Sequence, residues 1–227
     1  METSLHRQLK THYSADESQQ EVTVDGYRID AIAGGRLIEI QYGSLGAIRD
    51  KIHALLEHHD VLVVKPLAAR KFLVTKTRRN GRVKSSRYSP ARQTFYHLFD
   101  DLVHFVGVFP HRRLTLEVLL TEQEEHRLPA RRRRWRSKGY RVEDRTLRSI
   151  VDRLQLQTPN DLLKLLPRGL TQPFTTADIA ESAGIPRWLA QKMAYCLRKT
   201  AAAAAVGKRG NSVLYATPKT RRQQAAA

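Results

Sequence analysis

The sequence predicts an α/β fold in which a mixed sheet is flanked by helices, followed by a smaller helical domain. Residues 4–75 read as helix, three strands, helix and two strands. A helix between strands implies a crossover connection within a mixed sheet. After Gly169 the apolar spacing changes to that of short helices followed by a hairpin. The chain of 227 residues is long enough for two such domains.

The spacing of apolar residues places each element of the first domain. Alternation with a period of two indicates strands, whereas apolar residues that recur three and four positions apart indicate helices. In chain order, the predicted elements are a helix over 4–13 with Ser4 as its N-cap, a strand over 21–25, a hairpin over 27–43, a helix over 44–57, strands over 61–67 and 71–75, an exposed basic loop over 76–92, a helix over 93–105 and a strand over 112–124. Residues 145–157 fit a strand or a helix, and a strand that pairs with 114–121 is favoured.

The C-terminal part shows the element order of a winged helix-turn-helix domain. A helix is predicted to begin at Thr158, and two more over 176–183 and 186–199, before two short strands joined by a basic turn. We therefore predict a first domain over residues 1–157, a winged helix over 158–219 and a tail over 220–227. Such a domain usually binds DNA, and its alternative use is to bind another protein.

Charge gives the strongest global signal about partners. Forty Lys and Arg residues against 22 Asp and Glu residues give a net charge of +18, which indicates a polyanionic partner such as DNA. The alternative is a ribosomal or otherwise nonspecific basic protein. The single cysteine excludes a disulfide framework. The polar N-terminus does not resemble a signal peptide, and no apolar run approaches the roughly 20 residues that span a bilayer. We expect a cytoplasmic protein without a membrane partner.

The predicted hairpin over residues 27–43 places two acidic residues directly opposite each other. A two-residue turn at Gly34-Gly35 puts Asp30 opposite Glu39, with β-carbons about 5 Å apart. Two such carboxylates repel unless one takes up a proton or a divalent cation lies between them. Oxygen ligands favour Mg²⁺ or Mn²⁺. The alternative is a structural ion pair with an arginine. The other face, with Ile38 and Ile40, is expected to pack under the helix over 44–57.

Asp30 followed by Glu39-Ile40-Gln41 on the next strand resembles the signature of the PD-(D/E)XK nuclease superfamily, which has the restriction-endonuclease-like fold. The resemblance covers residues 4–75. The segments LHRQLK, VDGYRIDAI and LIEIQYGSLGAIRDKIHALL also resemble uncharacterised bacterial members that carry a C-terminal winged helix. The resemblance implies an endonuclease that hydrolyses phosphodiester bonds in DNA, with Asp30 and Glu39 as ligands of a catalytic Mg²⁺ or Mn²⁺.

The sequence departs from the superfamily at Gln41, where the signature has a lysine that activates the attacking water. Gln41 can hold a water but brings no charge. Arg28, which the predicted register places opposite Gln41, and Lys51 on the second helix are candidates for a replacement cation; the alternative for Lys51 is a solvated lysine. Glu21 is a candidate further metal ligand. His6 lies on the first helix, where some superfamily nucleases place a His or Glu.

Candidate DNA contacts lie on the last helix, in the wing and in the basic run that precedes Gly139. They are Arg187, Gln191, Lys192, Arg198, Lys208, Arg209, Arg133 and Arg134. Trp188 is a candidate for a DNA contact or for the core, and the core is favoured.

Three functions remain open at this point. The leading prediction is a metal-dependent DNA endonuclease targeted by a winged helix, and a homodimer would supply two sites for cutting both strands. The rival is a noncatalytic DNA-binding protein or regulator on a degenerate nuclease fold, which the missing lysine favours. The third is an RNA-binding accessory protein.

Overall fold

We describe the protein from a computed structural model, which describes residues 2–130 and 139–218. The chain forms two compact units, each assembled from three stretches of sequence. Unit 1 comprises residues 1–42, 58–95 and 116–154, and unit 2 comprises residues 43–57, 96–115 and 155–227. Residues 43–57 and 96–115 therefore belong to the same compact unit as the C-terminal part, whereas a division at residue 157 assigns them to the first domain.

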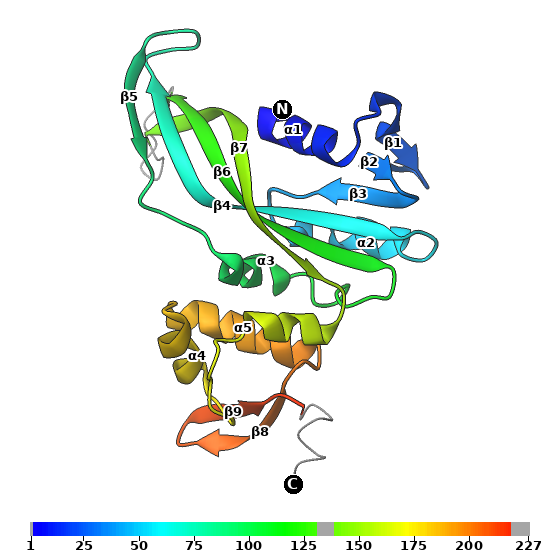
Figure 1. The fold of residues 1–227 in the computed structure, drawn as a ribbon, viewed down its shortest axis with the longest axis vertical. Coiled ribbons are helices and arrows are strands. Elements are labelled where there is room, and N and C mark those ends of the chain that lie inside the picture. The colour runs from blue at the N-terminus through cyan, green and yellow to red at the C-terminus, as the bar shows by residue number, and fades with distance from the viewer. Residues whose placement is uncertain (1, 131–138, 219–227) are drawn as a thin grey trace. The chain divides into compact units, whose positions relative to one another are not determined.

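The predicted mixed α/β architecture is confirmed by a seven-stranded sheet among the described residues, with strand order β1-β2-β3-β4-β6-β7 and β5 paired to β4 (Figure 1). The strands are β1 (Gln20–Val24), β2 (Tyr27–Ala33), β3 (Arg36–Ile40), β4 (Val61–Lys76), β5 (Val83–Tyr88), β6 (Leu114–Pro129) and β7 (Tyr140–Leu156). The β1–β2 and β2–β3 pairs are antiparallel, whereas β3 and β4 are parallel. The sheet is therefore mixed.

The β2–β3 hairpin has the register that its turn predicts. Ala33 pairs with Arg36, and the pairing continues to Ala31 and Ile38. Gly34 and Gly35 have φ angles of 57° and 72°. A type I′ turn needs positive φ at both central residues, which glycine adopts without strain. The two glycines thus set the register of the hairpin.

Helix α1 (Ser4–Tyr13) covers one face of the sheet in unit 1 (Figure 1). Its buried Leu5 and Leu9 join a hydrophobic cluster with residues of four strands, namely Ala31, Ile38, Ile40, Leu62, Val64 and Leu119. In this cluster, Ile38 and Ile40 pack against α1. The cluster contains no residue of the helix predicted over 44–57, under which they were expected to lie. The N-cap is Thr3, whose side chain accepts from the His6 backbone, while Ser4 donates to Asp144.

Two predictions about the middle of the chain are wrong. The segments 61–67 and 71–75 form one continuous strand, β4. The basic segment 76–92 contains β5, which pairs antiparallel with the end of β4. Tyr88 of β5 packs edge-on against Phe72 of β4, with ring centroids 5.1 Å apart. Because every residue of β5 is exposed, the strand lacks the apolar alternation by which sequence reasoning finds strands.

Unit 2 contains most of the remaining helices and a two-stranded sheet. Its elements, together with the short helix at its boundary, are η2 (Leu45–Ile48), α2 (Arg49–Leu55), η3 (Phe95–Leu98), α3 (Phe99–Leu102), η4 (Pro159–Leu165), α4 (Thr176–Ala183), α5 (Arg187–Lys199), β8 (Ala204–Arg209) and β9 (Ser212–Ala216). The predicted helix over 93–105 is shorter than expected, and the one after Thr158 is a 3₁₀ helix. None of the helices in the described ranges is long and apolar enough to cross a bilayer.

Helix α4 has the predicted bounds, and α5 differs from its predicted range only in that it begins at Arg187 instead of residue 186. Thr175 and Asp178 form a capping box at the start of α4, and Gly184 ends it with a φ of 61°. Helix α5 buries Leu189, Met193 and Leu197 along one side. Local sequence signals therefore determine this part of the fold.

The packing of α1 on the sheet gives a stability prediction. Leu9 is fully buried in the cluster, so Leu9→Ala should lower the free energy of unfolding by about 2–5 kcal/mol. Thr11→Ala changes an exposed position of the same helix and should alter it by no more than about 0.5 kcal/mol. Urea denaturation followed by circular dichroism measures both. Equal midpoints for the two variants would contradict the placement of α1.

Candidate active site

The hairpin brings the carboxylate of Asp30 against the strand that carries Glu39. Asp30 and Glu39 occupy the next position after the Ala31–Ile38 pair in the same register. Beyond this pair, the Asp30 side chain takes the place of a backbone acceptor. Its Oδ2 accepts a hydrogen bond from the Ile40 amide at 2.7 Å. The Asp30 side chain is 15% exposed and Glu39 is 8% exposed. The two acids predicted from the sequence therefore occupy opposite backbone positions of the hairpin, and both are largely shielded from solvent.

Side-chain alternation assigns Glu39 and Gln41 to one face. Ile38 and Ile40 belong to the cluster under α1, so the side chains of Glu39 and Gln41 point to the opposite face. The parallel pairing with β4 continues past the end of β3, since the Gln41 amide donates to the Val64 carbonyl at 2.9 Å. Gln41 therefore has Lys65 as its neighbour on β4.

Lys65 is a buried cation beside Gln41, an uncharged residue. Val64 belongs to the α1 cluster, so Lys65 shares the face of Glu39 and Gln41. Lys65 is 3% exposed, and its Nζ donates to the Tyr42 carbonyl at 3.2 Å. Sequence reasoning missed this residue by reading VLVVKPL only as a buried strand. The signal was a lysine inside an otherwise apolar strand, since lysine is rarely buried without a partner or a function.

His6 reaches the same carboxylate from α1. Its Nε2 lies 2.8 Å from Asp30 Oδ1. Burial lowers the pKa of His6, but the hydrogen bond to Asp30 and the charge of that carboxylate outweigh it, so the pKa is raised above 6.5. Both oxygens of Asp30 are thus engaged, one by His6 and the other by the Ile40 amide. This arrangement holds the Asp30 carboxylate in one orientation.

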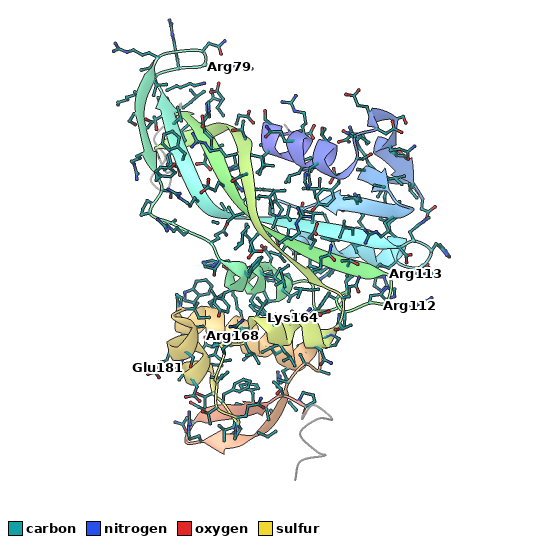
Figure 2. The ribbon with its side chains drawn as sticks, viewed as in Figure 1. Arg79, Arg112, Arg113, Lys164, Arg168 and Glu181 are labelled. Carbon is teal, nitrogen blue, oxygen red and sulfur yellow. The ribbon has the colours of Figure 1, made fainter. Side chains whose placement is uncertain are left out.

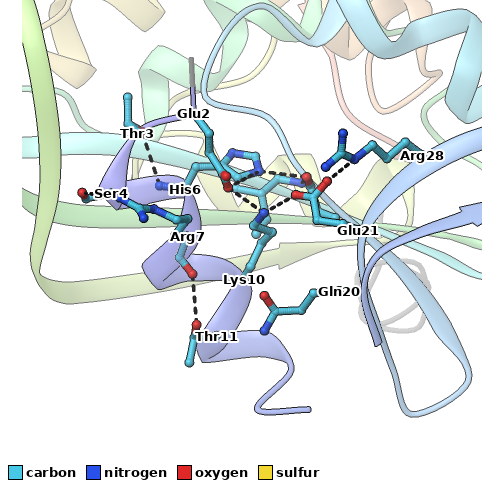
Figure 3. A network of polar contacts seen from close by, with 12 residues as sticks. Glu2, Thr3, Ser4, His6, Arg7, Lys10, Thr11, Gln20, Glu21 and Arg28 are labelled. Atoms are coloured by element: carbon cyan, nitrogen blue, oxygen red, sulfur yellow. Dashed lines mark hydrogen bonds and ion pairs between the residues drawn. The ribbon is translucent and has the colours of Figure 1, made fainter. Parts of the chain in front are cut away.

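Glu21 lies on β1, which pairs with β2 of the hairpin, and its carboxylate is bound by two cations. It stands between the pairs Gln20–Ala31 and Val22–Ile29, opposite Asp30. Its carboxylate forms ion pairs with Lys10 and Arg28 (Figure 3). Partial burial raises the pKa of Glu21, but the hydrogen bonds and charges of Lys10 and Arg28 outweigh it and lower the pKa. The predicted third metal ligand is therefore neutralised by protein cations.

The backbone at Glu21 is unusual. Its φ of 56° lies in the left-handed region, which non-glycine residues adopt infrequently. Such conformations persist only where the surrounding structure holds them, and they cluster at functional sites. The ion pairs of Glu21 with Lys10 and Arg28 hold the side chain in this position.

The acidic side chains can provide only a few of the ligands that a magnesium ion needs. No group of three His, Cys, Asp or Glu residues in the described ranges is arranged to hold a metal. Magnesium, however, is commonly bound by one or two carboxylates, with water and substrate phosphate as the other ligands. Asp30 and Glu39 can supply those carboxylates. His6 would then have to release its contact with Asp30.

A pocket of about 430 Å³ opens beside these residues. It is lined by Glu2, Thr3, His6, Glu21, Arg28 and Tyr42. His6 contacts Asp30, and Tyr42 accepts the hydrogen bond from Lys65 through its carbonyl. The pocket therefore gives access to the polar groups around the acids.

The two replacement cations proposed from the sequence, Arg28 and Lys51, lie on different elements. Arg28 binds Glu21, and the β2–β3 ladder covers only Ala31 to Ala33 on its strand. Lys51 lies half-buried on α2, in unit 2, whereas the acids belong to unit 1. Lys65 is the cation that the register brings beside Gln41.

The predicted DNA-contacting residues of α5 are mostly exposed. Arg187, Gln191 and Arg198 face solvent, while Lys192 is bound to Asp100 of α3 at 2.6 Å. Trp188 is 47% exposed, so its expected place in the core is wrong. Leu189 and Met193 fill that core instead, and α5 keeps a basic and aromatic outer face.

In the β8–β9 hairpin, the two predicted contacts differ. Lys208 is exposed on β8. The guanidinium of Arg209 binds both carboxylate oxygens of Asp178, at 2.6 and 2.7 Å, and so ties this hairpin to the cap of α4. Arg133 and Arg134 lie outside the described residues.

Comparisons with known proteins define the family. The family model described as a domain of unknown function, DUF8091, matches residues 3–157, and the chain belongs to this family. An uncharacterized protein of Treponema pallidum (strain Nichols) is 28% identical over 216 residues, which cover 94% of this chain and 84% of the relative. No solved structure matches the chain.

The His6–Asp30 contact predicts a pH response. Removing the carboxylate in Asp30→Asn should lower the pKa of His6, because the hydrogen bond and charge that raise it are lost. The pair stabilises the wild-type fold fully below pH 6.5, and this contribution is lost as the pH rises through the raised pKa of His6. Proton NMR titration, with the resonance assigned from His6→Gln, measures the shift. An unchanged His6 pKa in Asp30→Asn would contradict the contact.

Proposed function

We propose that this protein is a Mg²⁺- or Mn²⁺-dependent endonuclease that hydrolyses phosphodiester bonds in DNA. The observation that carries the proposal is the hydrogen bond between Asp30 Oδ2 and the Ile40 amide, which fixes one acid against the strand of the other. Glu39 and Gln41 share a face with Lys65 on the neighbouring strand. Two carboxylates, a water-holding amide and an ammonium group are the components that phosphodiester hydrolysis needs.

Each residue has a defined role in this proposal. Asp30 and Glu39 hold the metal ion, which when bound lowers the pKa of a water and stabilises charge on the phosphate. The Gln41 amide orients the attacking water by hydrogen bonding. Lys65 supplies the positive charge that the signature normally places at position 41. Its low exposure strengthens its interaction with a developing negative charge, because water screens that charge less.

Targeting to DNA is assigned to unit 2. The order α4, α5, β8 and β9 is that of a winged helix, in which the second helix enters the major groove. Helix α5 contains no acidic residue and exposes Arg187, Gln191 and Arg198. The net charge of +18 supports the same partner. A homodimer would place two such sites on one duplex and allow both strands to be cut.

The alternative is a noncatalytic DNA-binding protein. The contacts of Asp30 with His6 and of Glu21 with Lys10 and Arg28 favour it, since the acids already have protein cations as partners. In this function the acids would be structural, and binding would depend on unit 2. The nuclease is preferred because Lys65 is buried on the face of the sheet that Glu39 and Gln41 share.

Plasmid nicking separates these functions. Purified wild-type protein with Mn²⁺ or Mg²⁺ should convert supercoiled plasmid to nicked circles, whereas Asp30→Ala and Glu39→Ala should lose this activity because the metal ligands are removed. Agarose gels follow the conversion with time. Equal nicking by wild type and variants would indicate contamination. Absence of nicking together with tight, salt-sensitive binding would favour the noncatalytic function.

Lys65 can be tested separately as the relocated cation. Lys65→Met keeps the length of the side chain and should lower the rate of nicking about 10²–10³-fold, as expected when one group that stabilises the transition state is lost. Introducing Gln41→Lys into Lys65→Met should restore much of the rate, because it returns the charge to the motif position. Lys84→Met, at an exposed position of β5, serves as the control. Loss of activity in Lys51→Met with full activity in Lys65→Met would place the cation on α2 instead.

A further inference from the structure

The pocket beside the acids continues into a second, larger one. The second pocket has a volume of about 540 Å³ and is lined mainly by residues of β7 and of the turn between β4 and β5, namely Arg79, Arg141, Val142, Glu143 and Arg145, together with Glu2 and Thr3. Glu2 and Thr3 also line the pocket that contains His6 and Glu21, so the two pockets are adjacent. Together they form a groove within unit 1 that ends beside Asp30. We call it the strand groove.

The acids of the strand groove have cationic partners, whereas two of its arginines do not. Glu2 is bound to Lys10 at 2.6 Å, and Glu143 lies 3.7 Å from Lys76. Arg79 stands at the turn between β4 and β5 (Figure 2), and Arg141 is exposed at the start of β7. Their guanidinium groups have no hydrogen-bond or ion-pair partner among the described residues. The groove therefore offers positive charge to an anionic ligand.

Tyr42 and Arg145 add a planar surface to this charge. Arg145 lies over the Tyr42 ring, 4.7 Å from its centroid. Tyr42 lines the first pocket and Arg145 the second, so the stacked pair stands where the pockets join. Glu125 holds the Arg145 guanidinium in place at 3.0 Å. Aromatic rings and guanidinium planes of this kind stack with nucleic-acid bases that are not paired.

The size of the groove decides which form of nucleic acid fits. Volumes of about 430 and 540 Å³ lie in the range of sites for small-molecule ligands. They suit individual nucleotides of one strand, whose phosphates and bases are both exposed. A base-paired duplex is too wide for them and hides the faces of its bases within the stack.

We propose that the strand groove binds single-stranded DNA and leads it to Asp30. Phosphates contact Arg79 and Arg141, and an unpaired base stacks at Tyr42 and Arg145. The substrate is thus an unpaired segment, such as a flap or an overhang. This inference rests on the proposed nuclease function for the position of the cut, but not for the binding of the strand.

Binding without metal tests the groove independently of catalysis. Full-length protein is titrated in EDTA against a fluorescein-labelled mixed-sequence single strand and against a labelled hairpin duplex, with fluorescence anisotropy as the readout. Arg141→Glu should weaken binding of the single strand at least about tenfold and of the duplex less than about twofold. Arg198→Glu, on α5, should show the reverse preference. Arg36→Glu makes the same charge change at an exposed residue outside the groove and should alter neither affinity more than about twofold.

The crossed pattern of the two variants supports the inference. Equal effects of Arg141→Glu on single strand and duplex, or an effect no larger than that of Arg36→Glu, would overturn it. An RNA strand of the same sequence that binds more tightly than the DNA strand would also overturn the assignment to DNA. If the crossed pattern is found but Mn²⁺ produces no cleavage of a flapped duplex, the strand groove stands and the nuclease proposal fails.

Discussion

The hydrogen bond from the Ile40 amide to the Asp30 carboxylate is the interaction on which the candidate site depends. In a regular hairpin the Ile40 amide would donate to the backbone of β2, but the β2–β3 pairing ends at Ala31 and Ile38, two residues before Ile40. The Asp30 carboxylate therefore accepts the hydrogen bond of the Ile40 amide. Without this acceptor, a buried amide would lack a partner, which costs free energy. Its position follows from the Gly34-Gly35 turn, because a shift of one residue would move every side chain to the other face.

The surroundings of the acids show how a basic protein can hold carboxylates together without a large electrostatic penalty. His6, Lys10 and Arg28 compensate Asp30 and Glu21. The same groups can also meet the phosphates of a bound strand, because they line or adjoin the pocket beside Asp30. In the proposed nuclease, a metal ion would have to compete with these protein groups for Asp30.

Much of this arrangement could be predicted from the sequence. The turn residues fix the hairpin, and capping residues fix α4, because both signals act within a few residues of chain. The burial of Lys65 could not be predicted with the same reasoning, since it depends on the parallel pairing of β4 with β3, which joins residues far apart in sequence. Strand β5 was missed because its side chains are exposed and carry no pattern. The position of Trp188 could not be predicted because α5 has several apolar residues that could face the core. Leu189 and Met193 are buried there, and Trp188 is exposed.

The central claim is that Asp30 and Glu39 together bind one divalent metal ion, and direct measurement of Mn²⁺ binding tests it most closely. Electron paramagnetic resonance reports free Mn²⁺, so its signal should be reduced by wild-type protein with a stoichiometry of one ion per chain. Asp30→Asn and Glu39→Gln should each leave the signal close to that of free Mn²⁺, because a carboxylate ligand is lost. Binding by both variants as tight as by the wild type would contradict the account.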